Sequence, residues 1–262
     1  MPLYRSENWR VTQMGATKNT SGKFSASPKF LVMHYTAAGG GEGSAHFLFG
    51  PHKPASSAHF VVDRDGDVWQ LIDTGYTTWH AGESFWKGLS FLNRYAIGIE
   101  FANYGYWRAG IKEFDDSITA RHKNGGPVLK WENYPDKQIE SGMELTSWIL
   151  ANHKNIREIV GHDDIAPKRK SDPGPAFPMM TFRNLLLADQ SKPAPVSQTR
   201  YQVNATKLNV RGGPGTEFET LDWGPLVKGT RVTMLSGKDD WSYVKVEDKG
   251  EGWAFGQYLT PV

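Results

Sequence analysis

The chain has 262 residues, a length that predicts one large domain followed by a small one. Hydrophobic residues make up 39% and charged residues 22%, which excludes a disordered chain, and the net charge of +2 is too small to make nucleic acid or an anionic membrane the main partner. No cysteine is present, so disulfides and thiolate chemistry are excluded and any metal site must use His, Asp or Glu.

Short β-rich runs alternate with longer helical patterns over roughly the first 190 residues. This order predicts an α/β domain, a sheet flanked by helices. The turn Arg64-Asp65-Gly66 joins the second and third of the expected strands as a hairpin. The expected strands cover residues 30–36, 59–63, 67–72, 95–101 and 156–162.

Two helices are predicted in the second half of this region. One runs from about residue 135 to 152 and places Ile139, Met143, Ser147 and Leu150 along one face. The other follows residue 178 and includes Phe182. No run of about 20 apolar residues predicts a membrane span, and the first ten residues lack the apolar core of an export signal.

Residues 189–199 (DQSKPAPVSQT) replace large apolar residues with Pro, Ser, Lys and Gln, which predicts an interdomain linker. The remaining segment, residues 200–262, has short β-rich runs between Gly-rich turns, typical of a small all-β barrel. The predicted organisation is therefore a domain of residues 1–188, the linker, and a C-terminal domain of residues 200–262.

Two histidines fall at the ends of expected strands, where sheet enzymes gather ligands: His34 and His162. Asp172 lies ten residues after His162, and the prolines of the intervening loop allow its carboxylate to return to the same point. Two imidazoles and one carboxylate would hold zinc with a fourth position open to water. On spacing alone, the alternative of ordinary buried or surface histidines stays open.

Five motifs in chain order resemble the zinc-dependent N-acetylmuramoyl-L-alanine amidases of the AmpD and phage-lysozyme type. They are VMHYT, SSAHFVVDRDGDVWQLI, TTWHAGES, NRYAIGIEFAN and VGHDDIAPKRKSDPGPAF, within residues 25–188. The resemblance implies a mixed sheet flanked by helices and one zinc ion per chain, held by His34, His162 and Asp172. It also implies hydrolysis of the amide between N-acetylmuramic acid and L-alanine in peptidoglycan, by metal-activated water.

Two further residues have catalytic roles by this resemblance. Glu100 interrupts an apolar strand, where an acidic residue is costly unless it is paired or used, and it matches the general base and acid. Lys170 matches the lysine that stabilises negative charge on the carbonyl oxygen. The alternatives are a salt-bridged structural Glu100 and a solvated Lys170 within a basic run.

Substrate contacts are expected at His80, His59 and Asn103. For His80 the alternative is a hydrogen bond to loop backbone, for His59 the orientation of a neighbouring residue, and for Asn103 a turn. Some relatives carry a tyrosine directly before the position of His59, but this chain has Ala58, so a mechanism that needs that tyrosine is in doubt. Four aromatic residues are expected near the cleft mouth, either on sugar faces or in packing: Trp79, Trp86, Phe91 and Trp107.

The C-terminal segment resembles bacterial SH3-like domains through LNVRGGPG, KGTRVTML, WSYVKV and GWAFGQYL. Such domains hold wall hydrolases on peptidoglycan, so peptidoglycan is the expected partner, no protein partner is evident, and the cell envelope is the expected site of action. Two alternatives to an amidase are a peptidoglycan-recognition protein that binds the polymer without cutting it, and a zinc peptidase that cuts within the stem peptide. Four aromatic residues divide between ligand surface and core: Trp241, Tyr243, Trp253 and Tyr258.

Overall fold

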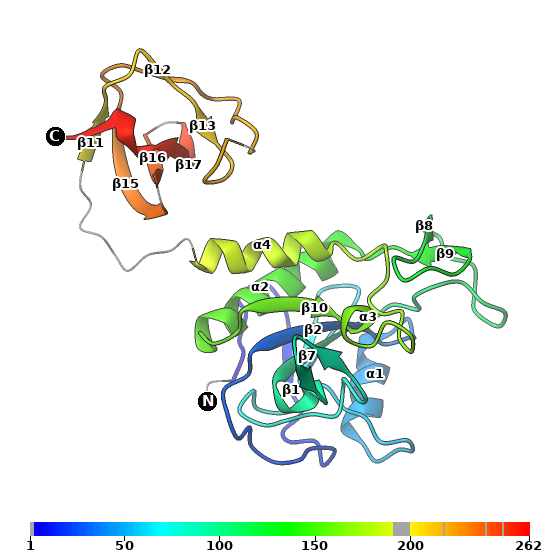
Figure 1. The fold of residues 1–262 in the computed structure, drawn as a ribbon. Coiled ribbons are helices and arrows are strands. Elements are labelled where there is room, and N and C mark those ends of the chain that lie inside the picture. The colour runs from blue at the N-terminus through cyan, green and yellow to red at the C-terminus, as the bar shows by residue number, and fades with distance from the viewer. Residues whose placement is uncertain (1–2, 191–199, 217, 239, 248) are drawn as a thin grey trace. The chain divides into compact units, whose positions relative to one another are not determined.

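The computed structural model describes residues 3–190, 200–216, 218–238, 240–247 and 249–262. The chain forms two compact units, Met1–Leu186 and Leu187–Val262, and each is described by itself (Figure 1). Helix α4 (Met179–Gln190) continues through the first two residues of the expected linker. The rest of that linker, residues 191–199, lies outside the described residues.

A six-stranded mixed sheet forms the centre of the first unit, in the order β1-β4-β3-β7-β2-β10. Among these strands the β3–β4 hairpin is antiparallel and the other neighbours are parallel. All five expected strands are confirmed to within two residues at either end, whereas β1 was not predicted. The strands are β1 (Val11–Gln13), β2 (Phe30–Tyr35), β3 (Phe60–Val62), β4 (Val68–Gln70), β7 (Ala96–Phe101) and β10 (Glu158–Gly161).

Helices cover both faces of this sheet (Figure 1). Helix α2 (Asp136–Asn152) and α4 bury Leu145, Ile149 and Phe182 in one core with β2 and β7. Helix α1 (Gly41–Phe49) packs on the other face, where Leu48 contacts the core beside β3 and β4. None of the helices in the described part of the chain is both long and apolar enough to cross a membrane.

The buried face of α2 differs from the predicted one. Ser147 is exposed, while Gln138 and Gly142 are buried. The Gln138 amide donates hydrogen bonds to the carbonyls of Val62 and Ala102 at the sheet, 3.0 Å each. A Cβ at Gly142 would lie 2.5 Å from the Phe101 ring, so glycine lets this helix approach the sheet closely. The hydrogen bonds of Gln138 and the close packing at Gly142 therefore determine which face of α2 points to the sheet. The spacing of hydrophobic residues predicts neither of these contacts.

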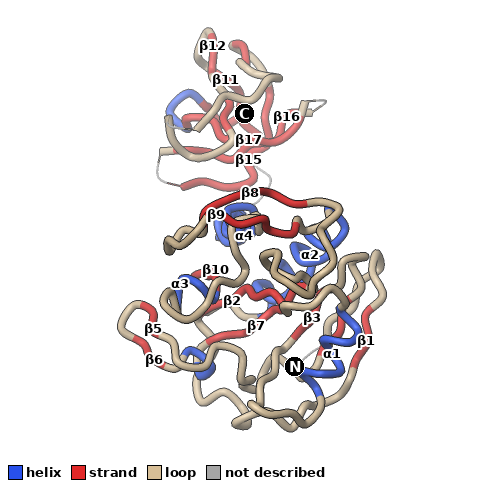
Figure 2. Tube along the Cα trace, turned by 90° about the vertical axis from the view of Figure 1, so that its right-hand side faces the viewer, coloured by secondary structure: helices blue, strands red, loops and turns tan. Residues whose placement is uncertain are grey.

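Short elements complete the first unit. Two small hairpins, β5–β6 and β8–β9, project from its loops, and neither was predicted (Figure 2). The remaining elements are β5 (Phe85–Trp86), β6 (Leu89–Ser90), the 3-10 helix η1 (Leu92–Arg94), β8 (Ser117–Arg121), β9 (Val128–Glu132) and α3 (His162–Ile165).

The second unit is the expected small all-β domain. Its main sheet has the order β13-β17-β16-β15-β11-β18 and encloses its own core, which includes Val210, Leu226 and Val244. The elements are β11 (Arg200–Val203), β12 (Lys207–Leu208), β13 (Val210–Arg211), β14 (Leu226–Val227), β15 (Arg231–Lys238), β16 (Trp241–Val246), β17 (Gly250–Phe255), η2 (Gly256–Tyr258) and β18 (Leu259–Pro261).

Candidate metal centre and catalytic cavity

Three neighbouring parallel strands bring the candidate residues to one edge of the sheet. In the β2–β7 pairing His34 lies opposite Glu100, and in the β10–β2 pairing Gly161 lies opposite Met33. His162 follows Gly161 directly and begins α3. Because the carboxyl ends of parallel strands meet at the same edge, residues distant in sequence become neighbours there.

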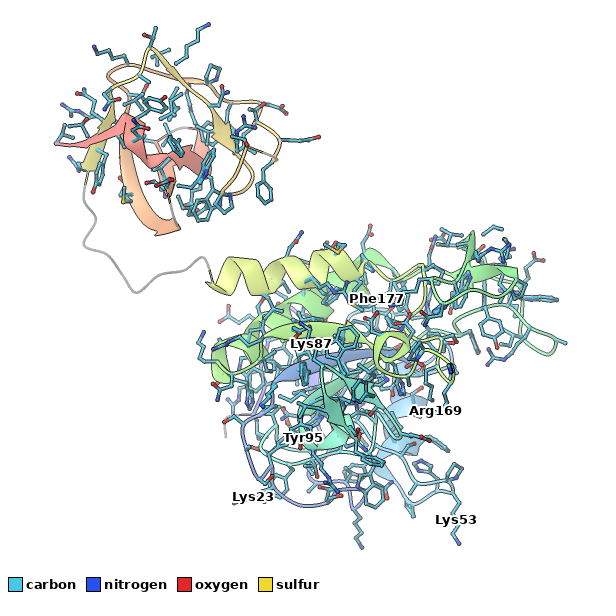
Figure 3. The ribbon with its side chains drawn as sticks, viewed as in Figure 1. Lys23, Lys53, Lys87, Tyr95, Arg169 and Phe177 are labelled. Atoms are coloured by element: carbon cyan, nitrogen blue, oxygen red, sulfur yellow. The ribbon has the colours of Figure 1, made fainter. Side chains whose placement is uncertain are left out.

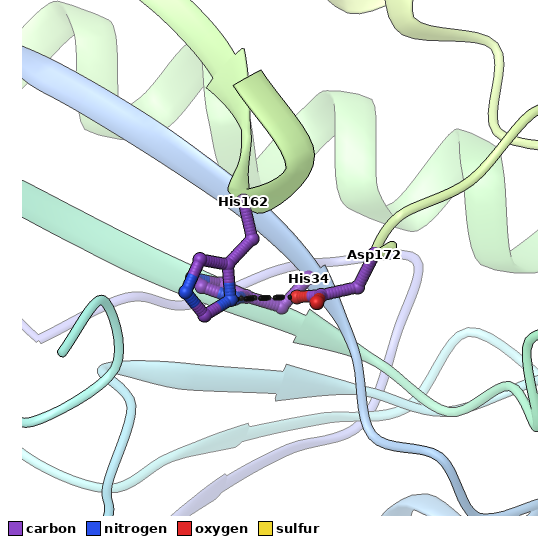
Figure 4. Close-up of side chains that lie close together, drawn as sticks. All are labelled: His34, His162 and Asp172. Atoms are coloured by element: carbon purple, nitrogen blue, oxygen red, sulfur yellow. Dashed lines mark hydrogen bonds and ion pairs between the residues drawn. The ribbon is translucent and has the colours of Figure 1, made fainter. Parts of the chain in front are cut away.

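His34, His162 and Asp172 form a buried cluster (Figure 4). The Nδ1 atoms of the two histidines are 2.9 Å apart, and each lies 2.9 Å from Oδ2 of Asp172. The side chains of the two histidines are almost inaccessible, and Asp172 is buried as well. The structure thus brings together the three residues that the sequence predicted as ligands.

Hydrogen bonds indicate which nitrogen of His34 is free to bind a metal. The carbonyl of Ala96 accepts a hydrogen bond from His80 Nε2 at 3.2 Å, so neutral His80 has an unprotonated Nδ1. That atom lies 3.0 Å from His34 Nε2, which must therefore carry the proton. Burial, followed by the neighbouring His162, lowers the pKa of His34 to about 4, which favours the neutral ring. The lone pair on His34 Nδ1 then points into the cluster.

His162 is oriented in the same way by the loop that follows Trp79. Its Nε2 donates to the carbonyl of Ala81 at 3.0 Å, which leaves Nδ1 of the neutral ring unprotonated. Arg169, on the segment after α3 (Figure 3), donates to the carbonyls of Ala81 and Glu83 at 2.7 and 2.6 Å. This role of Arg169 was not predicted, although the residue lies between His162 and Asp172 in the motif VGHDDIAPKRKSDPGPAF.

A cavity of about 740 Å³ opens over the cluster, and both Glu100 and Lys170 line it. Oε2 of Glu100 is buried and has no hydrogen-bond partner among the described residues. Burial raises the pKa of Glu100 well above its ordinary value and the Asp172 charge adds to this, whereas Lys170 opposes it. Glu100 is therefore a carboxyl group that is unpaired, faces the cavity and can hold or release a proton.

The three expected substrate contacts lie in different surroundings. His80 lines the cavity but is 7% exposed, and its two ring nitrogens are engaged with His34 and Ala96. His59 and Asn103 are fully buried and do not line the cavity. The ring nitrogens of His59 form hydrogen bonds with the Tyr76 carbonyl and the Gly98 backbone N–H. The side-chain oxygen of Asn103 accepts a hydrogen bond from the Gly105 backbone N–H at 2.7 Å. These contacts favour the orienting and turn-forming roles over substrate contact.

None of the four aromatic residues expected at the cleft mouth lines the cavity. Trp86 packs against the core beside β2, while Phe91 and Trp107 are exposed elsewhere. The aromatic side chains of the cavity wall are Tyr35, Phe47 and Tyr106. Phe47 comes from α1, a glycine-rich segment without a sequence signal for a helix.

A second cavity, of about 520 Å³, lies on the C-terminal unit. Trp241, Phe255 and Tyr258 line it together with the cations Lys207 and Arg211, and none of the described lining residues carries a carboxylate. Trp253 and Tyr243 do not line it. Trp253 is buried, and Tyr243 bonds to Glu251 on the neighbouring strand. We call this cavity the aromatic groove.

Comparisons with known proteins agree with this architecture. The family model described as N-acetylmuramoyl-L-alanine amidase matches residues 24–175, and the model described as bacterial SH3 domain matches residues 206–260. A crystal structure of a selenomethionine AmpD derivative has the same fold, with a TM-score of 0.51 and 24% identity over 71% of this chain and 99% of that chain.

Curated relatives carry amidase names. N-acetylmuramoyl-L-alanine amidase AmiD of Escherichia coli is 35% identical over 57% of this chain and 50% of its own length. 1,6-anhydro-N-acetylmuramyl-L-alanine amidase AmpD of Enterobacter cloacae is 32% identical over 53% of this chain and 61% of its own length. The chain thus spans between half and two thirds of these relatives. Since the amidase model covers more than half of the 262 residues, this protein belongs to the N-acetylmuramoyl-L-alanine amidase family, and its C-terminal unit is a bacterial SH3 domain.

Proposed function

We propose that this protein is a zinc hydrolase that cleaves the amide between N-acetylmuramic acid and L-alanine in peptidoglycan. The observation that carries the proposal is the His34–His162–Asp172 cluster at the floor of a cavity that also contains Glu100 and Lys170. The amidase names of AmiD and AmpD support the same reaction and substrate. Incubation with purified peptidoglycan tests it, and release of stem peptides with a free L-alanine amino terminus is the expected result.

The three cluster residues fit a zinc ion by their donor atoms. Two unprotonated imidazole nitrogens and one carboxylate oxygen converge within 2.9 Å of one another, an arrangement of lone pairs that a cation stabilises. Zinc is suited to this set of nitrogen and oxygen ligands, and none of the three ligand positions needs a thiolate. When bound, zinc supplies Lewis acidity, which polarises a carbonyl and lowers the pKa of water.

Glu100 and Lys170 supply the other groups that amide hydrolysis needs. Glu100 faces the cavity with an unpaired oxygen and a raised pKa, so it can accept a proton from attacking water and donate it to the departing amine. Lys170 is a cation on the cavity wall and can stabilise the negative charge that develops on the carbonyl oxygen. Neither role needs a tyrosine at the position of Ala58.

Replacing Lys170 with alanine is expected to slow hydrolysis of a soluble muropeptide by ~100-fold or more, because one stabilising charge is lost at the oxyanion. Zinc content should stay at one ion per chain, since no cluster residue changes. Lys168→Ala is the matched control, because Lys168 is an exposed member of the same basic run and does not line the cavity. Equal turnover by the two variants would contradict the role of Lys170.

We propose further that the SH3 domain holds the protein on peptidoglycan of the cell envelope, and that the aromatic groove contacts the polymer. Three aromatic side chains and two cations line the groove, which suits a flat or aliphatic ligand that carries carboxylates. The stem peptides of peptidoglycan carry such carboxylates. Binding there would raise the local concentration of the catalytic unit on its polymer.

This role predicts that Tyr258→Ala weakens binding to sacculi by ~10-fold or more, as expected for an aromatic anchor of a binding surface. The full chain carrying Glu100→Gln is used so that the sacculi stay intact, and cosedimentation measures binding. Phe218→Ala is the control, because Phe218 is an aromatic residue of similar exposure, 37% against 42%, outside the groove. If both variants sediment like the parent chain, the groove is not the wall-binding surface.

A further inference from the structure

The tip of the β8–β9 hairpin is bonded to Asp163, the residue that directly follows the proposed ligand His162. His122 Nε2 donates to Oδ2 of Asp163 at 3.0 Å, and Lys123 forms an ion pair with Oδ1 of the same carboxylate at 2.8 Å. The side-chain amide of Asn124 donates a hydrogen bond to the backbone carbonyl of Asp163 at 2.7 Å. Three consecutive residues of one turn therefore hold Asp163 at both side chain and backbone.

The geometry of the turn fixes the proton on His122. The backbone amide of Asn124 donates to His122 Nδ1 at 3.1 Å, so Nδ1 is an acceptor and the proton of the neutral ring lies on Nε2. That N–H is the donor to Asp163. His122 and Asp163 are 9% and 2% exposed, so the hydrogen bond is shielded from water, where its loss would leave a buried carboxylate without that donor.

Asp163 in turn connects the two ligand segments. Its backbone N–H donates to the carbonyl of Asp172 at 2.8 Å, so the residue after one ligand holds the other ligand directly. Its side chain folds back over Gly161, where a Cβ would lie 2.1 Å from Oδ1 of Asp163. Displacement of Asp163 would therefore change the position of both His162 and Asp172.

The far end of the hairpin segment holds the chain just beyond Asp172. The Tyr134 hydroxyl donates to the carbonyl of Pro173 at 2.7 Å. Trp131 packs against Gly174, where a Cβ would lie 2.8 Å from the indole ring. The segment from β8 to Tyr134 thus contacts the residues that follow each of the two ligands, His162 and Asp172.

We propose that the β8–β9 hairpin positions His162 and Asp172 for metal binding, with His122 and Lys123 acting through Asp163. This inference rests on the metal assignment of the proposed function. His122, Lys123 and Asn124 do not line the catalytic cavity, so they are positioning residues and not substrate contacts. Partners that orient metal ligands in this way typically contribute 10–100-fold to metal affinity.

Zinc affinity of the full chain tests the proposal. The zinc-free protein competes with a coloured zinc chelator, and His122→Ala and Lys123→Ala are each expected to raise the dissociation constant by ~10-fold or more. Lys130→Ala is the matched control, because Lys130 is a lysine of the same hairpin that forms its ion pair with the exposed Glu113 and not with Asp163. His122→Gln, which retains an N–H donor, should recover part of the affinity.

A second measurement separates positioning from general stability. The melting temperature of the zinc-free protein should be similar in Lys123→Ala and Lys130→Ala, and the KM for a soluble muropeptide at saturating zinc should be unchanged. The proposal would be overturned if His122→Ala and Lys123→Ala bound zinc as tightly as Lys130→Ala does. It would also be overturned if these two variants had a lowered melting temperature but an unchanged zinc affinity. If the unmodified chain binds zinc but releases no stem peptide, the proposed function alone fails; if it binds no zinc, both fail.

Discussion

Replacing His162 with alanine is expected to remove zinc binding and amide hydrolysis together. The substitution deletes one of three converging ligand atoms and leaves His34 Nδ1 and Asp172 Oδ2 as an incomplete set. The loss in rate should exceed the 10–100-fold that is typical for a residue that only orients a ligand. Elemental analysis of the purified protein and turnover of a soluble muropeptide are the two measurements.

A histidine elsewhere in the same unit provides the control for this substitution. His46 is exposed on α1 and belongs to no metal cluster found among the described residues, so His46→Ala should keep one zinc ion and full activity. An active, zinc-containing His162→Ala variant would contradict the ligand assignment. Activity without zinc in the unmodified protein would contradict the metal mechanism as a whole.

The isosteric change Glu100→Gln is expected to preserve the fold and the zinc ion but to lower the rate by at least ~100-fold, the scale for loss of a general acid or base. The amide keeps the size of the side chain in β7 while removing the group that accepts and donates the proton. Turnover at saturating substrate and zinc content measure the two effects separately.

Glu140→Gln is the control for Glu100→Gln, because Glu140 is exposed on α2 and does not line the cavity. The control should match the unmodified chain in both zinc content and rate. Near-normal turnover by the Glu100 variant would show that another group moves the proton. His80, which lies between His34 and the Ala96 carbonyl, would then be the next candidate.

Apolar runs predicted five of the six strands of the main sheet, because those strands are buried on both faces and therefore read as nearly continuous apolar sequence. The same strands place His34 and His162 at one sheet edge, so the candidate cluster could also be anticipated. Sequence spacing could not show that His80 Nδ1 faces His34 Nε2, since that contact depends on how the loop after Trp79 packs over Gly98. A Cβ at Gly98 would lie 2.5 Å from the His80 ring.

Elements that are stabilised mainly by contacts with residues distant in sequence were not predicted. Helix α1 begins in a run of glycines that lowers helix propensity, and it is stabilised by packing on β3 and β4. The strands of the β8–β9 hairpin have only five residues each, and the tip of the hairpin is fixed by Asp163, some 40 residues later in the chain. For the same reason His122 carried no functional signal in the sequence, although the structure connects it to the candidate metal centre.

Mass spectrometry of a purified-peptidoglycan digest, with and without a zinc chelator, tests the central claim most directly. The proposed function predicts intact stem peptides that begin with a free L-alanine and glycan strands that keep unsubstituted lactyl groups, with both products lost in chelator and restored by added zinc. Fragments cut within the stem peptide would indicate a peptidase instead. Binding to the polymer without any released product would indicate a recognition protein, and either result would contradict the proposed amidase.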